Sequence, residues 1–132
     1  MQFAPYISFL LVIAALTMAA CQNTAPFTQE PVRYYDVQTR LLDNDLVQFH
    51  VTLSGTKSAE QVARYAECAA AHYTLIRGFG FACHVRTRIG QQADRLSADA
   101  VYTISRSLPQ GTKTIDAEVV ADACARDNIP MV

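Results

Sequence analysis

The sequence predicts an α+β fold, with an antiparallel sheet of four to five strands and one long helix packed on one face. Three observations lead to this prediction. Apolar and polar residues alternate in two segments before residue 55, an alanine-rich segment with helical periodicity occupies residues 58–78, and further alternating segments follow it. Because strands lie on both sides of a single long helix, we expect the order β-β-α-β-β with a short β/α tail.

Two strands are expected before the helix. Apolar residues alternate with polar ones from Tyr35 to Leu41, and the alternation is most regular from Val47 to Leu53. Asp43-Asn44-Asp45 favours a turn between the two segments, and Gly55 favours the end of the second. The two strands should therefore form an antiparallel pair.

A helix is expected to begin after Ser58 and to end at Gly78. Ser58 is a natural N-cap, and Gln61 stands three residues later at the capping-box position. Gly78 is typical of a residue that terminates a helix. The side chains expected to form the buried stripe are Val62, Tyr65, Ala66, Ala69, Tyr73 and Ile76, with Glu60, Arg64, Glu67 and Thr74 opposite.

Two more strands are expected at Phe79–Ile89 and Ala98–Ser107, with a polar loop over residues 90–97. Residues 113–120 fit either a last strand or the start of a helix, and residues 121–126 suit a short helix. In the first of these strands, alternation places Phe81, Cys83, Val85 and Ile89 on the core face, and His84, Arg86 and Arg88 on the other face.

The distribution of charge separates a leader from the domain. No Lys, Arg, Asp or Glu occurs before Glu30, and Ile7–Ala20 is an apolar run of 14 residues interrupted only by Ser8 and Thr17. A helix needs about 20 apolar residues to cross a bilayer, so this run better fits the apolar region of a signal peptide. The net charge of −1 gives no electrostatic reason to expect nucleic acid as a partner.

The segment Met18-Ala19-Ala20-Cys21 resembles the lipobox of bacterial lipoproteins. The resemblance implies that residues 1–20 are removed, that Cys21 is lipidated, that 21–32 form a tether, and that 33–132 form a single globular domain. An ordinary cleaved signal peptide and an uncleaved anchor remain alternatives. The implied location is the cell envelope, anchored to a membrane through the lipid and facing the periplasm. Gln22 favours the outer membrane over the inner one.

A second resemblance covers the helix and its exit. The segments Tyr65–His72 and Gly78–Phe81 resemble small alphaproteobacterial lipoproteins of unassigned function, in which an alanine-rich helix is followed by a glycine-aromatic exit. The resemblance implies an envelope location and no known activity.

Three cysteines remain if Cys21 is acylated, so they can form one bridge and leave one thiol. We favour Cys68–Cys124, because Cys68 lies beside the helix stripe and Cys124 lies in a tail that needs fastening. Cys68–Cys83 and the absence of any bridge stay open. Cys83 is expected to behave as a buried apolar side chain.

The chemistry-bearing residues suggest a binding face. If the strands pair as their alternation indicates, the sheet surface away from the helix gathers two histidines and several cations, namely Arg40, His50, His84, Arg86 and Arg88, with Gln48 among them. Such a face could be plain solvated sheet. It could also bind an envelope protein or an anionic cell-wall partner.

No motif in the chain indicates catalysis, a metal or a cofactor. There is no C-x-x-C, no H-E-x-x-H and no G-x-S-x-G, and Gly78-Phe79-Gly80 lacks the third glycine of a dinucleotide loop. We therefore expect a non-catalytic binding or structural module of the envelope. The alternative is a small envelope hydrolase or redox accessory protein that uses His50, His84 or a free thiol.

Overall fold

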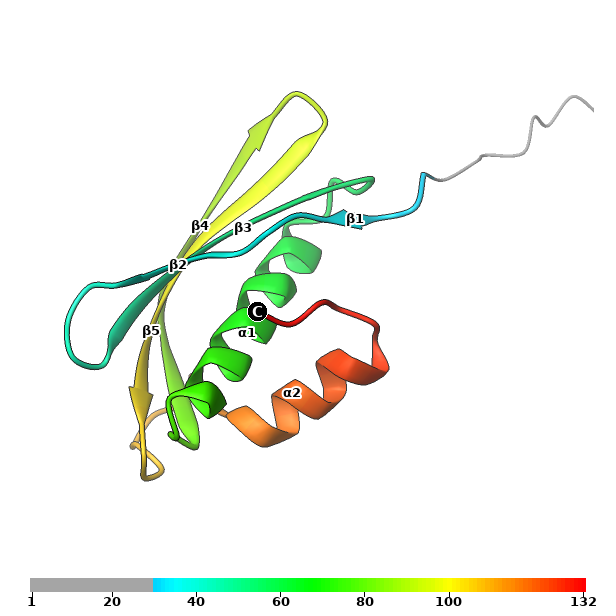
Figure 1. The fold of residues 1–132 in the computed structure, drawn as a ribbon. Coiled ribbons are helices and arrows are strands. Elements are labelled where there is room, and N and C mark those ends of the chain that lie inside the picture. Colours follow the sequence, from blue (N-terminus) through cyan, green and yellow to red (C-terminus); the bar gives the residue numbers. More distant parts are fainter. Residues whose placement is uncertain (1–29) are drawn as a thin grey trace, which may run out of the picture.

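The computed structural model describes residues 30–132, which form a curled antiparallel sheet with two helices on one side of it (Figure 1). The strands are β1 (Arg33–Tyr34), β2 (Gln38–Leu41), β3 (Leu46–Ser54), β4 (Phe81–Gln92), β5 (Arg95–Ser105) and β6 (Thr114–Asp116), and the helices are α1 (Ala59–Ile76) and α2 (Ala117–Arg126). The expected fold class is confirmed.

The strands lie in the order β1-β3-β5-β4-β6, and β2 pairs with the same edge of β3 as β1 does. Of the strand expected from Tyr35 to Leu41, only Gln38–Leu41 is strand, and the short strand β1 precedes the expected range. Between them, the Tyr35 N–H still donates to the Thr52 carbonyl oxygen at 3.0 Å. The long central strands β3 and β5 are paired along nine residue positions, from Leu46↔Thr103 to Ser54↔Arg95.

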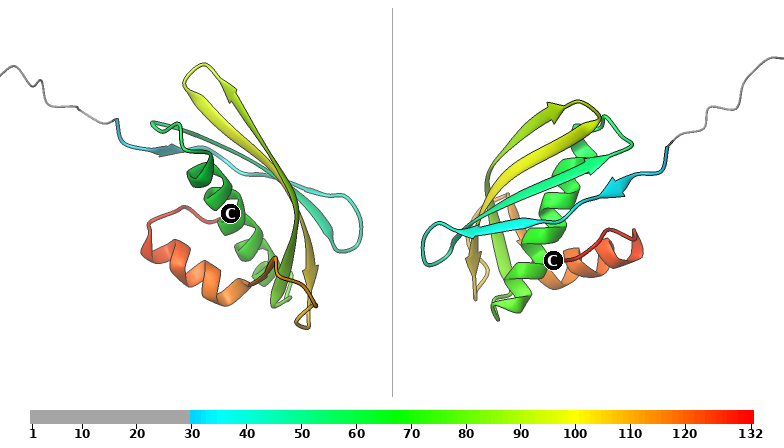
Figure 2. Two further views of the ribbon diagram at one scale, coloured as in Figure 1. Left: turned by 180° about the vertical axis from the view of Figure 1, so that it is seen from behind. Right: turned by 45° about the horizontal axis from the view of Figure 1, so that its top comes forward.

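The β4–β5 hairpin is longer than the sequence predicts. A loop was expected over residues 90–97, but the strands continue to a turn at Ala93-Asp94, where Ala93 has a positive φ of 54°. The end of this hairpin projects past α1 (Figure 2). Because both of its faces meet solvent there, no apolar alternation marks the strands.

The core lies between the sheet and α1. The fully buried strand residues alternate along β3 and β5, as the pleat requires. The buried set includes Val47, Phe49, Val51 and Leu53 of β3, Ala98, Ala100, Tyr102 and Ile104 of β5, and Val62, Tyr65, Ala66 and Ala69 of α1. The short alanine side chains let α1 approach the sheet closely.

The C-terminal end of α1 departs from the predicted stripe. Ile76 is 62% exposed, whereas Thr74 is fully buried and its hydroxyl donates to the Ala70 carbonyl oxygen at 2.7 Å. The burial pattern changes because α2 covers a second side of α1. The capping prediction for the other end is confirmed, since the Ser58 Oγ accepts the Gln61 N–H at 3.2 Å.

The tail, left open between strand and helix, contains both. β6 pairs with β4, and α2 begins immediately after it at Ala117, four residues earlier than expected. Asp116 sets this start, because its carboxylate accepts the N–H groups of Glu118 and Val119 at 3.1 and 3.3 Å. An N-cap of this kind satisfies backbone donors that the helix itself leaves unpaired.

Cys68 and Cys124 form a disulfide bond between α1 and α2, with their Cα atoms 5.9 Å apart. This is the pairing that we favoured from the sequence. Both residues are fully buried. The bond therefore fastens the tail, including the adjoining strand β6, to the helix that covers the core.

The leader, Cys21 and most of the tether lie outside the described residues. At the start of the described part, Val32 packs against the core, although the sequence assigned it to the tether. The preceding Pro31 carbonyl oxygen lies 2.6 Å from the position that a Cβ on Gly55 would occupy, so only glycine fits there at its φ of 85°. Within residues 30–132, neither helix is long and apolar enough to span a bilayer.

Candidate functional site

A bulge at Val85 divides β4 and reverses its alternation. His84 pairs with Tyr102 and Arg86 pairs with Val101, so Val85 is left without a partner on β5. Because paired residues share a face of the sheet, His84 lies on the helix side with the buried Tyr102, and Arg86 lies on the outer side. The prediction that His84 shares the outer face with Arg86 and Arg88 is wrong.

The same bulge changes the place of the free cysteine. Cys83 pairs with Thr103, which lies on the outer side, and Ala82 pairs with the buried Ile104. Cys83 is half-buried and is the free cysteine among the described residues. The prediction that Cys83 lies on the core face is wrong, because the inward positions before the bulge are Ala82 and His84.

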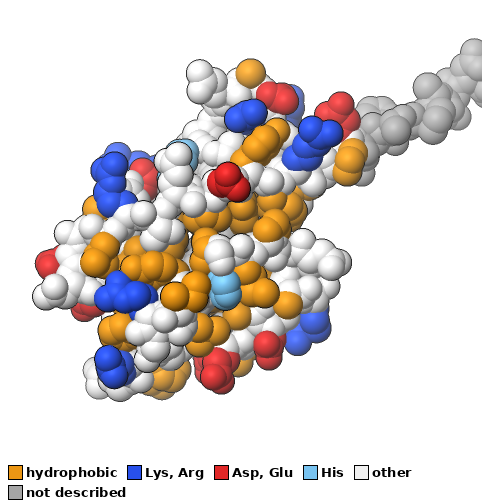
Figure 3. All heavy atoms as spheres, in the orientation of Figure 1, with side chains coloured by type: hydrophobic (Ala, Val, Ile, Leu, Met, Phe, Trp, Pro, Cys, Tyr) orange, Lys and Arg blue, Asp and Glu red, His pale blue; other side chains and the backbone are white. Residues whose placement is uncertain are grey.

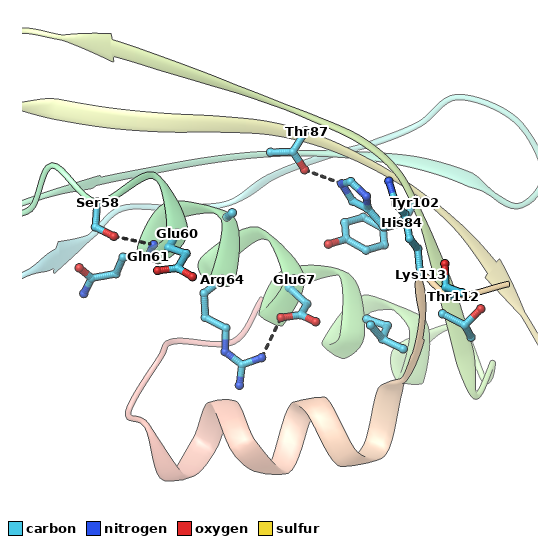
Figure 4. Close-up of a pocket in the computed structure, with 13 residues that line it drawn as sticks. Ser58, Glu60, Gln61, Arg64, Glu67, His84, Thr87, Tyr102, Thr112 and Lys113 are labelled. Atoms are coloured by element: carbon cyan, nitrogen blue, oxygen red, sulfur yellow. Dashed lines mark hydrogen bonds and ion pairs between the residues drawn. The ribbon is translucent and has the colours of Figure 1, made fainter.

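An open groove of about 940 Å³ runs between the N-terminal half of α1 and β4 (Figure 4). Its wall on α1 carries both signs of charge, and its other wall comes from β4 and the segment before β6. The ionisable and polar side chains that define its chemistry are Glu60, Arg64, Glu67, His84, Thr87 and Lys113. We call this cleft the α1–β4 groove.

His84 is positioned by contacts on two sides. Its Nε2 lies 2.7 Å from the Thr87 Oγ1, and its ring stands edge-on to that of Tyr102, with centroids 5.2 Å apart. Burial lowers the pKa of His84, and the Lys113 ammonium lowers it further, while the Glu67 carboxylate opposes both. The imidazole is therefore neutral at pH 7, and it can accept or donate a hydrogen bond in the groove.

The α1 wall of the groove is held by ion pairs. The Arg64 Nη1 lies 2.8 Å from the Glu67 Oε2, and the Arg64 Nη2 lies 3.7 Å from the Asp127 Oδ2 at the end of α2. Burial and the Glu67 carboxylate raise the pKa of Tyr102 above its ordinary value, so its hydroxyl stays protonated. Figure 4 shows Glu67 between Arg64 and the pair formed by His84 and Tyr102.

The outer face of the sheet carries the other predicted residues in two rows. Arg88, Asp99, His50 and Gln38 are aligned across four strands, as are Arg86, Val101, Gln48 and Arg40. Neighbouring strands are about 4.8 Å apart, so about 14 Å separates Arg40 from Arg86. The structure thus places Arg40, His50, Arg86 and Arg88 on one face, but Arg40 and His50 lie on β2 and β3, and β5 separates them from Arg86 and Arg88 on β4.

Asp99 lies between these two groups. Its carboxylate accepts two hydrogen bonds from the Gln48 Nε2, at 2.8 and 2.9 Å, and lies 3.9 Å from the Arg86 Nη1. Arg88 is exposed, and within the described residues it takes part in no ion pair. The β4 edge of the outer face therefore carries two arginines, Arg86 and Arg88, beside a single carboxylate.

Sequence reasoning missed the α1–β4 groove. Glu67 appeared only as a solvent-facing helix residue, and Thr87 and Lys113 drew no attention. The bulge that brings His84 to these residues leaves no trace in the pattern, because Ala82 and Cys83 are both apolar and either could face the core. His50 and His84, considered together in the sequence, lie on opposite sides of the sheet.

No group of three or more His, Cys, Asp or Glu side chains within residues 30–132 is arranged to hold a metal ion. Figure 3 shows apolar side chains in the centre of the face that carries the helices, with charged side chains mainly around its rim. The charged side chains on this face therefore lie mainly at its rim and along the α1–β4 groove.

Residues 34–128 match the model of the YNQ4 C-terminal domain family. The chain belongs to that family. Over 87 residues it is 26% identical to the "Uncharacterized 26.9 kDa protein in nqo8 5′ region" of Paracoccus denitrificans, an alphaproteobacterium. The alignment covers 66% of this chain and 34% of the relative, so the chain spans about a third of that protein's length. No solved structure matches the chain.

Proposed function

We propose that this chain is a lipid-anchored, non-catalytic binding module of the bacterial cell envelope. It is attached through Cys21, faces the periplasm, and sits preferentially at the outer membrane. The lipobox-like segment that ends at Cys21 supports the anchor. The disulfide between Cys68 and Cys124 supports an oxidising compartment, since such bonds persist mainly outside the cytosol.

The observation that carries the binding role is the α1–β4 groove. It has a volume of about 940 Å³ and is open along its length, with an arginine, a lysine and two glutamates on its walls. A shape of this kind suits one stretch of a larger partner, because the partner can lie along the groove while the rest of it stays in solvent. The two candidate partner classes are an envelope protein and an anionic cell-wall component.

The anchor is tested by metabolic labelling with a fatty-acid analogue. We expect the wild-type chain to be labelled, and Cys21→Ser to remain as unlabelled, unprocessed precursor. A Cys21→Ser variant that matures normally and keeps the label would refute the anchor.

The binding role is tested by capture of partners from solubilised envelopes with the intact lipoprotein. Ala63→Trp fills the α1–β4 groove from α1, and Ala125→Trp adds the same bulk at an exposed position of α2. We expect Ala63→Trp to reduce the captured partner at least about tenfold and Ala125→Trp to leave it unchanged. Equal capture by both variants would exclude the groove from binding.

One observation favours a second candidate, a small envelope hydrolase. The His84 Nε2 and the Thr87 Oγ1 are 2.7 Å apart at the groove, which is the contact that a base and a hydroxyl nucleophile need. This candidate predicts turnover of an ester or amide probe that is lost in both His84→Ala and Thr87→Val. The binding module predicts no turnover by the wild-type chain.

A further inference from the structure

The second half of β4 has a free edge. β4 pairs with β5 along nearly its whole length, but its pairing with β6 covers only Phe81–Cys83. One further bond, from the His84 N–H to the Lys113 carbonyl oxygen at 3.0 Å, ends the contact on that side. Within residues 30–132, nothing pairs with this edge from Arg86 to Gln92. At about 3.3 Å per residue, the free edge is about 20 Å long.

The hairpin fixes which backbone groups this edge presents. Gln92 and Arg95 flank the two-residue turn, so they exchange hydrogen bonds with each other across the hairpin. In an antiparallel ladder every second residue bonds to the same neighbour. Arg86, Arg88 and Gly90 therefore bond to β5. The N–H and C=O groups of Thr87, Ile89 and Gln91 point to the free edge.

An additional strand at this edge would have two different sides. It would extend the line of β6, and its inward side chains would meet Thr87 and the α1 wall of the α1–β4 groove. Its outward side chains would lie beside Arg86 and Arg88 on the outer face. Such a strand gains main-chain hydrogen bonds along the edge and specificity from alternate side chains.

The arginines beside the free edge indicate which side chains an added strand should carry. Opposite charges on neighbouring strands stabilise pairing and like charges directly opposite destabilise it, so acidic residues fit beside Arg86 and Arg88. Asp99, the acidic residue in the rows containing these arginines, bonds to Gln48 and pairs with Arg86 at 3.9 Å. One carboxylate is therefore shared by two arginines, and Arg88 has no ion pair within the described residues. A second copy of this chain would fit poorly, because β4 contains no acidic side chain that could lie beside the Arg86 and Arg88 of the other copy.

We propose that the Arg86–Gln92 edge of β4 binds an extended peptide segment of a partner protein by strand addition. The segment carries acidic side chains at alternate positions, which face Arg86 and Arg88, and small apolar side chains between them, which lie beside Thr87 and Ile89 on the helix side of the sheet. This inference rests on the proposed binding role and adds the class of partner. It is independent of the lipid anchor.

The experiment measures binding of capped synthetic peptides to the full chain in detergent micelles. In the main probe glutamate alternates with valine over about seven residues, and in its counterpart lysine replaces glutamate. Two further probes are N-methylated on the backbone, one at the valines and one at the glutamates. Arg86→Glu combined with Arg88→Glu is the test variant. Arg40→Glu, on the same face but at the other edge, is the matched control.

We expect the glutamate peptide to bind the wild-type chain at least about tenfold more tightly than the lysine peptide. The double reversal should invert this preference, and Arg40→Glu should leave it unchanged. N-methylation of one alternate set should abolish binding while the other set has little effect, because only every second peptide N–H can face β4. Equal effects of the two methylated sets would reduce the site to a simple anion patch and overturn strand addition.

Self-association provides a second way to overturn the proposal. If sedimentation shows a dimer that Ile89→Pro dissociates, the edge belongs to a second copy of the chain.

Failure of the proposed function can be distinguished from failure of the strand-addition site. An envelope partner that is still captured after reversal of Arg86 and Arg88 would keep the binding role and reject the edge. If the wild-type chain is not labelled by the fatty-acid analogue, the proposed anchor is refuted, whereas peptide binding at β4 does not depend on that result.

Discussion

The two halves of β4 lie on the same strand and differ in almost every property. Before Val85, the strand is enclosed by β5 and β6, and Ala82 is fully buried against the core. After Val85, it pairs with β5 alone, and Arg88 and Ile89 are exposed. The first half serves stability. The second half has backbone N–H and C=O groups without a partner strand and carries the exposed Arg88, and a binding edge requires such groups.

The bulge at Val85 lets the two halves of β4 direct their polar side chains to opposite faces of the sheet. It shifts the alternation by one residue, so that the first half can direct His84 into the α1–β4 groove while the second half keeps Arg86 and Arg88 on the outer face. Without it, a strand of this sequence would carry all three side chains on one face. A single unpaired residue thus places the imidazole and the arginines on opposite sides of the strand.

The largest contrast is expected from the same substitution in each half. Ala82→Asp should lower the free energy of unfolding by about 3–5 kcal/mol, because it places an unpaired carboxylate in the core. Ile89→Asp, at a residue that is 43% exposed, should lower it by only about 1–2 kcal/mol, through partial loss of apolar burial and strand propensity. Urea denaturation of the full chain measures both. Similar losses in the two variants would abolish the distinction between the halves.

Removal of the disulfide should weaken the first half selectively. Replacing Cys68 and Cys124 by alanine should cost about 2–4 kcal/mol, since the bond closes a long loop with a sequence separation of 56. β6 adjoins α2, so amide exchange at Phe81–Cys83 should accelerate more than exchange at Arg88 or Gly90. Equal acceleration along β4 would mean that the tail does not support the first half.

Charge reversal in the second half should have little effect on stability. Arg86→Glu combined with Arg88→Glu should lower the free energy of unfolding by only about 1–2 kcal/mol, because both side chains lie on the open face and the new carboxylates repel only Asp99. Thermal denaturation measures this, with Phe49→Ala as a reference that should cost about 3–5 kcal/mol for loss of a fully buried ring. A severe loss from the reversals would mean that the outer face is covered.

The smallest effect concerns the pH dependence that His84 contributes. Its pKa is lowered in the folded chain, so the unfolded chain binds the proton more readily. Stability should therefore be fully retained above about pH 6.5 and fall as the pH drops below that value. His84→Gln should flatten this part of the curve. A stability that rises with acidification in the wild type alone would contradict the position of His84.

The fold could be predicted from the sequence because its long-range order follows from periodicity and capping. Ser58 and Gly78 bound α1, and the alternation in β3 appears unaltered in the structure. The candidate site could not be predicted. The shift at Val85 is hidden by the apolar neighbours Ala82 and Cys83, and the groove joins residues from α1, β4 and the start of β6 that no local pattern connects.

The Cys68–Cys124 pairing was favoured from the sequence for a reason that the structure explains. Cys68 lies on the flank of the α1 stripe, and this flank is the side that α2 covers. Cys83 misled us, because an apolar residue in an alternating strand gives no sign of a bulge two residues later. Tertiary pairing fixed its place on the outer face.

Amide hydrogen exchange along β4 can show directly whether its second half is an open binding edge. In the free chain, we expect fast exchange at Thr87, Ile89 and Gln91 and slow exchange at Arg86, Arg88 and Gly90. Saturation with the glutamate–valine peptide should slow the first set at least about tenfold and leave the second set unchanged. Slow exchange at all six amides of the free chain, or no protection of the first set by the bound peptide, would contradict an open binding edge on β4.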